Sequence, residues 1–233
     1  MQPVVLITGT SRGLGLLMTQ SFLAAGYMVI GCSRDKFSID SEAYFHYTLD
    51  ISDEISVGEM FSDMRKRQFI PRILINNAAL TQAGLAVFTK ASVARSILDV
   101  NLLGSFLITR EVVKLMQRNK FGRVINITSI NVPLASAGGA LYNASKSGLE
   151  TLGRTIASEF NSFDLTVNNL GLSLVDGTTM VKLLDDKAKQ AKRIHLLKSD
   201  NISIDEIMAA INFFASTEAK NITGQTLYFG GVW

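Results

Sequence analysis

The sequence has few of the residues that crosslink a chain, bind a metal ion or separate domains. Its one cysteine, Cys32, cannot form an internal disulfide, and its two histidines, His46 and His195, lack the spacing of metal ligands. It has three prolines in 233 residues and no linker rich in Ser, Gly or Pro. We therefore predict a single domain over residues 1–233 with no metal site.

Long apolar runs and strong charge are missing as well. No run approaches the roughly 18 apolar residues of a membrane span, and the apolar stretch at residues 4–7 is too short for a signal peptide. These absences predict a cytoplasmic protein with no membrane partner. The net charge of +3 includes basic clusters at 114–123 and 182–198 without a base-reading motif, so we expect solvated helix faces and no nucleic acid. An acidic carrier or a phosphorylated substrate is the alternative.

Hydrophobic residues, 47% of the chain, gather in short runs that alternate with longer stretches of helical period. The runs are apolar on both faces, as in buried parallel strands, and the stretches at 14–25, 53–67, 100–118 and 142–160 are long enough for crossover helices. The predicted strands are 4–8, 28–32, 45–49, 72–76, 123–128 and 165–170. This order predicts an α/β fold, a doubly wound parallel sheet of Rossmann type, whose ligands lie beyond the carboxyl ends of the strands.

A glycine-rich turn, TGTSRGLG, follows the first predicted strand and places Gly9, Gly13 and Gly15 before a helix. Glycines there let the backbone approach a pyrophosphate, whose charge the amino terminus of the helix stabilises. The spacing is G-x-x-x-G-x-G, and by itself such a run is equally typical of a turn with a helix cap. Its place between a strand and a helix favours a dinucleotide site.

The end of the second predicted strand, GCSRDK, lies where a dinucleotide-binding fold reads the adenosine ribose. An acidic residue there binds a 2'-hydroxyl and repels a 2'-phosphate, whereas this chain has Ser33 and Arg34, with Arg12 in the glycine turn. Charge-assisted hydrogen bonds from guanidinium groups to a phosphate favour NADP(H). Asp35 carries the opposite charge, and two merely solvated arginines are the alternative.

A hydroxyl and a tyrosine–lysine pair indicate acid–base chemistry. Ser129 closes the fifth predicted strand, and Tyr142 and Lys146 share one face of the next helix at i, i+4 spacing. An ammonium about 4 to 5 Å from a phenol favours the phenolate by roughly 3 to 4 kcal/mol, which lowers the tyrosine pKa from about 10 toward 7 to 8. A general acid or base works best in that range. Alone, the pair is more typical of an ordinary amphipathic helix.

Six ordered motifs carry a resemblance that covers residues 4–231. They are TGTSRGLG, NNAA, DVNLLGSF, INITS, YNASK and ITGQTLYFGG, and together they resemble the single-domain short-chain dehydrogenase/reductase family. The resemblance implies a catalytic tetrad in which Tyr142 exchanges a proton with a carbonyl oxygen that Ser129 holds. Lys146 lowers the tyrosine pKa and binds the nicotinamide ribose, and Asn101 anchors a water for proton relay.

The resemblance also implies a set of residues that contact the coenzyme, NADPH or NADP+. Asp50, Ile51 and Asn77 follow the third and fourth predicted strands, where turn and capping roles are the alternative. The full set is Gly9, Arg12, Gly13, Leu14, Gly15, Ser33, Arg34, Asp50, Ile51, Asn77, Tyr142, Lys146 and Thr178.

Two positions depart from the family pattern. Ala79 stands where the family usually has the glycine of NAG, and Leu172 and Ser173 stand where it usually has Pro-Gly beside the nicotinamide. The polar and basic segment at about 173–200 is expected to form a mobile lid over the substrate. The departures leave open a second class of function, a coenzyme-binding sensor or assembly protein with weak catalysis.

Among relatives, the sequence looks most similar to 3-oxoacyl-carrier-protein reductases. This implies reduction of a 3-oxoacyl thioester or related ketone, small or bound to a carrier protein that Lys120 would meet. Sugar or small-alcohol oxidation on the same framework is the alternative. The resemblance further implies a homodimer or homotetramer, with Gly148 and Gly153 allowing close packing of the helix that carries Tyr142.

Overall fold

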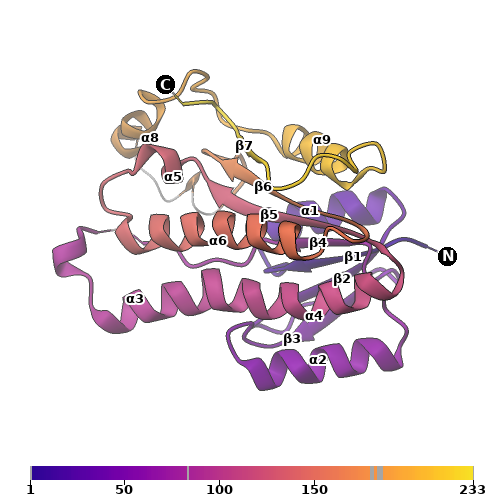
Figure 1. The fold of residues 1–233 in the computed structure, drawn as a ribbon. Coiled ribbons are helices and arrows are strands. Elements are labelled where there is room, and N and C mark those ends of the chain that lie inside the picture. The colour runs from indigo at the N-terminus through magenta and orange to yellow at the C-terminus, as the bar shows by residue number, and fades with distance from the viewer. Residues whose placement is uncertain (1, 83, 179–180, 183–185, 233) are drawn as a thin grey trace.

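A computed structural model describes residues 2–82, 84–178, 181–182 and 186–232, and its centre is one parallel sheet (Figure 1). Within these residues the sheet has seven strands in the order β3-β2-β1-β4-β5-β6-β7, and every neighbouring pair is parallel. The strands are β1 Val4–Thr8, β2 Met28–Ser33, β3 Tyr44–Thr48, β4 Ile73–Asn76, β5 Phe121–Ser129, β6 Asp164–Leu172 and β7 Thr226–Tyr228. The predicted doubly wound α/β fold is confirmed.

Helices cover both faces of the sheet (Figure 1). One face carries α2, α4 and α6, and the other carries α1 and α9. The helices and short turns are α1 Gly13–Ala24, α2 Glu54–Lys66, η1 Ala86–Phe88, α3 Ala91–Leu98, η2 Asp99–Gly104, α4 Ser105–Arg118, α5 Asn131–Leu134, α6 Ala140–Glu159, α8 Asp186–Arg193 and α9 Ile204–Ala215.

Two apolar cores explain why the strands are apolar on both sides. Leu6 packs into the core under α2, α4 and α6, whereas its neighbours Val5 and Ile7 pack into the core under α1 and α9. Successive side chains of a strand point to opposite faces, so a strand between two helical layers needs apolar residues at every position.

A row of three buried amides and one partly exposed threonine crosses the sheet beneath α4 and α6. Asn76, Asn126, Asn169 and Thr226 are direct partners in the register of β4, β5, β6 and β7. The Asn76 amide donates to Asn126 at 2.9 Å, the Asn126 amide donates to Asn169 at 2.9 Å, and the Asn169 amide donates to Thr226 at 3.0 Å. We call these four residues the amide row. Each interstrand bond satisfies a buried polar group that would otherwise be costly.

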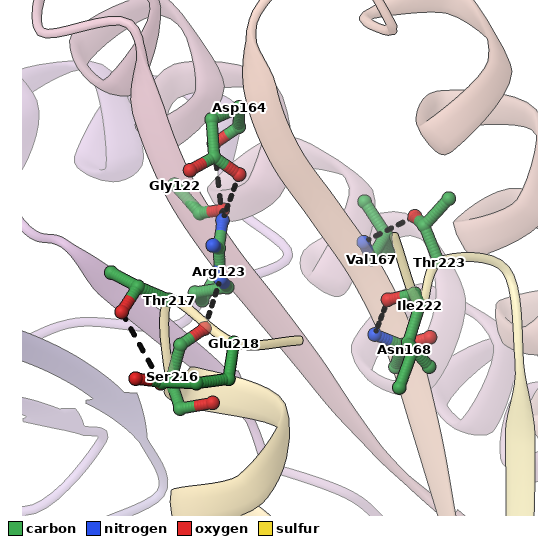
Figure 2. Close-up of polar contacts among 10 residues, drawn as sticks. All are labelled: Gly122, Arg123, Asp164, Val167, Asn168, Ser216, Thr217, Glu218, Ile222 and Thr223. Atoms are coloured by element: carbon green, nitrogen blue, oxygen red, sulfur yellow. Dashed lines mark hydrogen bonds and ion pairs between the residues drawn. The ribbon is translucent and has the colours of Figure 1, made fainter. Parts of the chain in front are cut away.

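The segment between α9 and β7 is tied to the sheet by side-chain hydrogen bonds (Figure 2). Arg123 of β5, with no exposed surface, forms an ion pair of 2.8 Å with Asp164 and donates from Nε to the carbonyl of Ser216. Asn168 of β6 donates to the carbonyl of Ile222 at 2.8 Å. These bonds place the carboxyl-terminal strand β7 beside β6.

Three elements differ from the sequence prediction. The predicted helix at 100–118 is continuous with α3 through the π-helical segment η2. Residues 91–118 are long and apolar enough to cross a membrane by length and composition, but the buried side of α4 packs on the sheet. Helix α9 and strand β7 were not predicted, although Ser203 and Glu206 form a capping box that marks the start of α9.

Candidate active site

The glycine turn after β1 is shaped by close backbone contacts. Gly9 and Gly13 have φ of +76° and +57°, which favour glycine, and a Cβ on Gly15 would lie 2.0 Å from the carbonyl oxygen of Gly9. Asn77 fixes the turn from the end of β4, because its amide donates to the carbonyl of Thr8 at 2.9 Å. The predicted turn therefore needs glycine for its own geometry, and Asn77 is a support as well as a lining residue.

A cavity of about 190 Å³ opens at the carboxyl ends of β1, β2 and β4. It brings together seven of the residues predicted to contact the coenzyme: Gly9, Arg12, Ser33, Arg34, Asp50, Ile51 and Asn77. The other lining residues are Ser11, Cys32, Asp35, Leu49, Ala78, Ala79, Leu80 and Val100. Most of these additional residues are next to a predicted one in the sequence. The expectation that ligands lie beyond the carboxyl ends of the strands would have found them if each predicted set had been widened by one residue.

The remaining predicted coenzyme residues do not line this cavity within the described residues. Gly13 and Leu14 begin α1, and Gly15 is covered by Gly9. Tyr142 and Lys146 belong to the catalytic group on α6. Thr178 is buried, and its hydroxyl donates to the carbonyl of Val175 at 2.8 Å, so its hydroxyl proton is used within the chain.

One end of the cavity has the chemistry of a phosphate site. Ser33 ends β2, Arg34 follows it, and Arg12 reaches the same cavity from the glycine turn. In the part of the chain that the structure describes, neither guanidinium takes part in an ion pair. Both cations are therefore available to an anion, and the backbone at Gly9, which lines the cavity before the amino terminus of α1, fits the pyrophosphate of a nicotinamide dinucleotide.

Ser129, Tyr142 and Lys146 meet where β5 ends against α6. The Ser129 hydroxyl lies near enough to the Tyr142 phenol to lower its pKa, and the Lys146 Nζ lies 6.0 Å from the centre of the Tyr142 ring. Lys146 is buried, and its ammonium donates to the carbonyl of Ile127 at 2.7 Å. The structure thus assembles three of the four predicted catalytic residues in one group.

The pKa of Tyr142 differs in direction from the prediction. Burial raises the pKa of Tyr142, and the hydrogen bond from Ser129 opposes this without reversing it. Burial also lowers the pKa of Lys146 to about 8, against the attraction of Glu150. The expected lowering of the tyrosine pKa by Lys146 was wrong for this arrangement, because the ammonium is bonded to Ile127 and burial dominates.

Asn101 lies in the π-helical segment η2 and links the loop at Leu80 to the catalytic helix. Its side chain accepts from the Leu80 backbone N–H at 2.7 Å and donates to the Leu80 carbonyl at 2.9 Å. It also donates to the Ser145 hydroxyl at 2.9 Å, and that hydroxyl donates to the Tyr142 carbonyl at 2.7 Å. Both amide hydrogens are thus bonded within the protein, and the predicted water-anchoring role stays a prediction.

Gln82 is a functional candidate that the sequence analysis missed. Helix α6 begins after Gly139, which provides no side-chain cap. The Gln82 side-chain oxygen instead accepts from the backbone N–H of Leu141 at 2.8 Å and of Tyr142 at 3.4 Å. Because the cap comes from a loop far away in the sequence, no local pattern could have identified it.

The lid segment and the altered positions are described in part. Leu172 pairs with Ser129 in the register of β6 and β5, and Ala79 lines the cavity, so both departures are accommodated. Val175 and Ile202 form a bridge that joins the two ends of the segment, and α8 lies between them. Its predicted motion is untested, and residues 179–180 and 183–185 lie outside the described residues.

Position bears on two further predictions. Lys120 precedes the first residue of the nine-residue strand β5, so it lies about 30 Å along the strand from Ser129, and its predicted contact with a carrier protein stays a prediction. Gly148 and Gly153 face their own chain: a Cβ would lie 3.2 Å from Leu102 at Gly148 and 2.9 Å from the Asn126 amide at Gly153. They therefore permit packing inside the subunit.

Comparisons with known proteins agree with this geometry. A family model described as short chain dehydrogenase matches residues 3–189. The chain is 31% identical over 229 residues to the 3-oxoacyl-(acyl-carrier-protein) reductase FabG of Rickettsia bellii, covering 97% of this chain and 94% of that protein.

Two solved structures show the same fold. The protein ElxO with NADP bound has a TM-score of 0.87 and 26% identity, and the match covers 98% of this chain and 97% of ElxO. A 4-hydroxyisoleucine dehydrogenase complexed with NADH has a TM-score of 0.87 and 23% identity, over 99% of this chain and 98% of that one. The two neighbours thus hold different coenzymes, NADP in ElxO and NADH in the dehydrogenase.

Proposed function

The chain belongs to the short-chain dehydrogenase family, and from this membership we propose that it is an NADPH-dependent carbonyl reductase acting on a 3-oxoacyl thioester or related ketone. The family makes it an oxidoreductase with a nicotinamide coenzyme. The observation that carries the proposal is the Ser129, Tyr142 and Lys146 group beside a glycine-lined cavity.

When bound, the coenzyme would supply a hydride for the carbonyl carbon. Tyr142 donates its phenolic proton to the carbonyl oxygen, which becomes the hydroxyl of the product. Ser129 holds that oxygen by a hydrogen bond. Burial raises the pKa of Tyr142, so the phenol carries its proton before the reductive step.

Lys146 contributes a buried ammonium whose Nζ lies 6.0 Å from the centre of the Tyr142 ring. With a pKa of about 8 it carries a proton for most of the time at pH 7. The same ammonium lies low enough in pKa to pass a proton on, so that Tyr142 can be reprotonated for the next turnover.

The choice of NADPH over NADH rests on charged hydrogen-bond donors. Arg12, Ser33 and Arg34 line the cavity, and their two guanidinium groups and one hydroxyl match a 2'-phosphate. Asp35 and Asp50 line the same cavity and balance the two arginine charges, so the preference rests on direct hydrogen bonds from the guanidinium groups and not on an excess of positive charge.

The choice of substrate rests on relatives. The Rickettsia bellii protein and others that match along nearly the whole chain are named as 3-oxoacyl-(acyl-carrier-protein) reductases. On the same grounds we propose that the carbonyl compound is carried by an acyl carrier protein, and that the enzyme is a cytoplasmic homodimer or homotetramer.

The experiment is an NADPH-oxidation screen across acetoacetyl-CoA, simple ketones and keto sugars. We expect turnover with acetoacetyl-CoA, and expect Tyr142→Phe to abolish it while NADPH binding, followed by coenzyme fluorescence, changes by less than about twofold. Turnover that survives in Tyr142→Phe would remove the assigned proton donor. Turnover with keto sugars alone would replace the proposed substrate class.

A further inference from the structure

A row of hydrogen bonds leads from the glycine turn to Ser33 through two side chains of β3. The fully buried Thr10 lies 3.0 Å from the Tyr44 hydroxyl, which lies 2.7 Å from Nδ1 of His46. Nε2 of His46 lies 3.0 Å from the Ser33 hydroxyl and 3.2 Å from the carbonyl oxygen of Asp35. The row therefore ends on the side chain that faces the predicted 2'-phosphate position.

The partners of His46 fix which nitrogen carries its proton. A carbonyl oxygen only accepts, so Nε2 bears the hydrogen that faces Asp35 and Ser33. Nδ1 then accepts from the Tyr44 hydroxyl. Burial lowers the pKa of His46, which keeps the ring in this neutral form with one donor and one acceptor.

The fold makes space for this row. A Cβ on Gly31 of β2 would lie 2.5 Å from both the Thr10 and the Tyr44 hydroxyl oxygens, so a side chain there would displace the pair. Phe37 covers the row from the other side, with its ring centre 6.2 Å from that of Tyr44 and 5.9 Å from that of His46.

Ser33 has a single proton, and its hydroxyl donates that proton to the carbonyl of Asp35 at 2.8 Å. To donate to a phosphate oxygen, the hydroxyl must turn away and leave the carbonyl. The Nε2 hydrogen of His46 is within reach of the same carbonyl and can replace the lost bond. Without that replacement, the carbonyl of the exposed residue Asp35 exchanges a hydrogen bond within the protein for one to water when the phosphate binds.

We propose that His46 is a specificity-determining positioning residue, which frees the Ser33 hydroxyl for the 2'-phosphate of NADPH by taking over its bond to the Asp35 carbonyl. The inference rests on the proposed use of NADPH. A 2'-hydroxyl, by contrast, can donate to the oxygen of Ser33 and leaves the Ser33 to Asp35 bond in place. Loss of the His46 donor therefore weakens NADPH binding and spares NADH binding.

The test compares two amide replacements of His46. In His46→Gln the amide nitrogen can occupy the position of Nε2, whereas in His46→Asn the shorter amide reaches only the position of Nδ1 beside Tyr44. We expect His46→Asn to lower affinity for adenosine 2',5'-bisphosphate by about fivefold, the factor for the roughly 1 kcal/mol net contribution of one hydrogen bond. Its affinity for ADP, which lacks the 2'-phosphate, should stay within about twofold. His46→Gln should retain most of the preference.

Calorimetry with both nucleotides gives a readout that does not depend on turnover. Ser33→Ala should lower the ratio of the affinity for adenosine 2',5'-bisphosphate to the affinity for ADP. Adding His46→Asn to Ser33→Ala should not change this ratio further, because His46 acts through Ser33. If His46→Asn does not fold, His46→Phe removes the same donor while keeping the packing against Phe37.

The outcomes separate this inference from the proposed function. A wild-type protein that binds both nucleotides equally would overturn the NADPH proposal and the inference with it. A wild-type protein that prefers the 2'-phosphate, with His46→Asn showing the same preference, would overturn the inference alone. Equal weakening of both nucleotides in His46→Asn would also overturn it, since that is the mark of a purely structural role.

Discussion

Replacing Gln82 with Met tests whether the catalytic helix α6 depends on a cap supplied by a distant loop. Methionine has nearly the same length and no acceptor, so the backbone N–H groups of Leu141 and Tyr142 lose their partner. Loss of a helix cap costs about 1 kcal/mol, and the bond of 2.8 Å from the Gln82 amide to Thr89 adds up to roughly another 1 kcal/mol. We expect a total of about 1 to 2 kcal/mol.

This free energy has two measurable effects. For a domain of this size, 1 kcal/mol lowers the melting temperature by about 2 to 4 °C, so Gln82→Met should melt roughly 2 to 8 °C lower in a thermal scan. Tyr142 lies in the loosened first turn of α6. If holding its phenol in the catalytic position costs about 1 kcal/mol more than in the wild type, kcat falls about fivefold. The KM for NADPH should not change, since Gln82 does not line the coenzyme cavity.

Gln82→Glu is the matched control. Its carboxylate keeps an acceptor for both N–H groups and adds a negative charge at a helix amino terminus, which is favourable. With acetoacetyl-CoA as substrate, kcat of Gln82→Glu should stay close to that of the wild type. A Met variant with unchanged kcat and melting temperature would refute the role of the cap, and equal losses in both variants would assign the effect to the Thr89 bond.

Two further predictions concern buried charge. Lys146 has a pKa of about 8 in the folded protein and about 10.4 when unfolded, so the folded state releases this proton first and stability rises with pH between those values. In urea melts, the free energy of unfolding of the wild type should therefore rise by up to roughly 3 kcal/mol relative to that of Lys146→Met between pH 7.5 and 10.5. If the difference in this free energy between the two proteins does not depend on pH, the reasoning is wrong. Asp164→Ala leaves the buried Arg123 guanidinium without its carboxylate and should cost about 2 kcal/mol of stability, less than for a fully buried pair because Asp164 is half-exposed. The kcat of Asp164→Ala should equal that of the wild type. A lower kcat in the folded variant would contradict this and show that the start of β6 influences the catalytic site.

Much of the fold could be predicted from the sequence because the signals are local. The apolar runs at residues 4–8 and 28–32 match β1 and β2 closely, since strands buried on both faces need apolar residues throughout. Strand β7 has only three residues, none of them buried, so its sequence carries no such pattern. It joins the sheet through bonds such as the one from Asn168 to Ile222, which depend on tertiary structure.

The candidate site divides in the same way. Ser129 was predicted from its place at the end of a strand, and Tyr142 and Lys146 from their spacing on a helix. Both signals are local in the sequence. The contribution of His46 depends on the pairing of β3 with β2, and the cap from Gln82 depends on how a loop folds against α6. The direction of the Tyr142 pKa depends on burial, which spacing alone does not give.

The amide row has a consequence for how length changes in this chain affect its chemistry. Asn126 and Asn169 are fixed side by side, and Ser129 and Leu172 are paired at the carboxyl ends of the same two strands. A residue inserted in the loop between α4 and β5 can be absorbed there, because the row keeps the strand ends level. A residue inserted between Asn126 and Ser129 would displace the serine by about 3.3 Å, several times the roughly 0.5 Å that a catalytic arrangement tolerates. The short stretch from the row to the strand ends therefore has a fixed length, whereas the loop before β5 can vary.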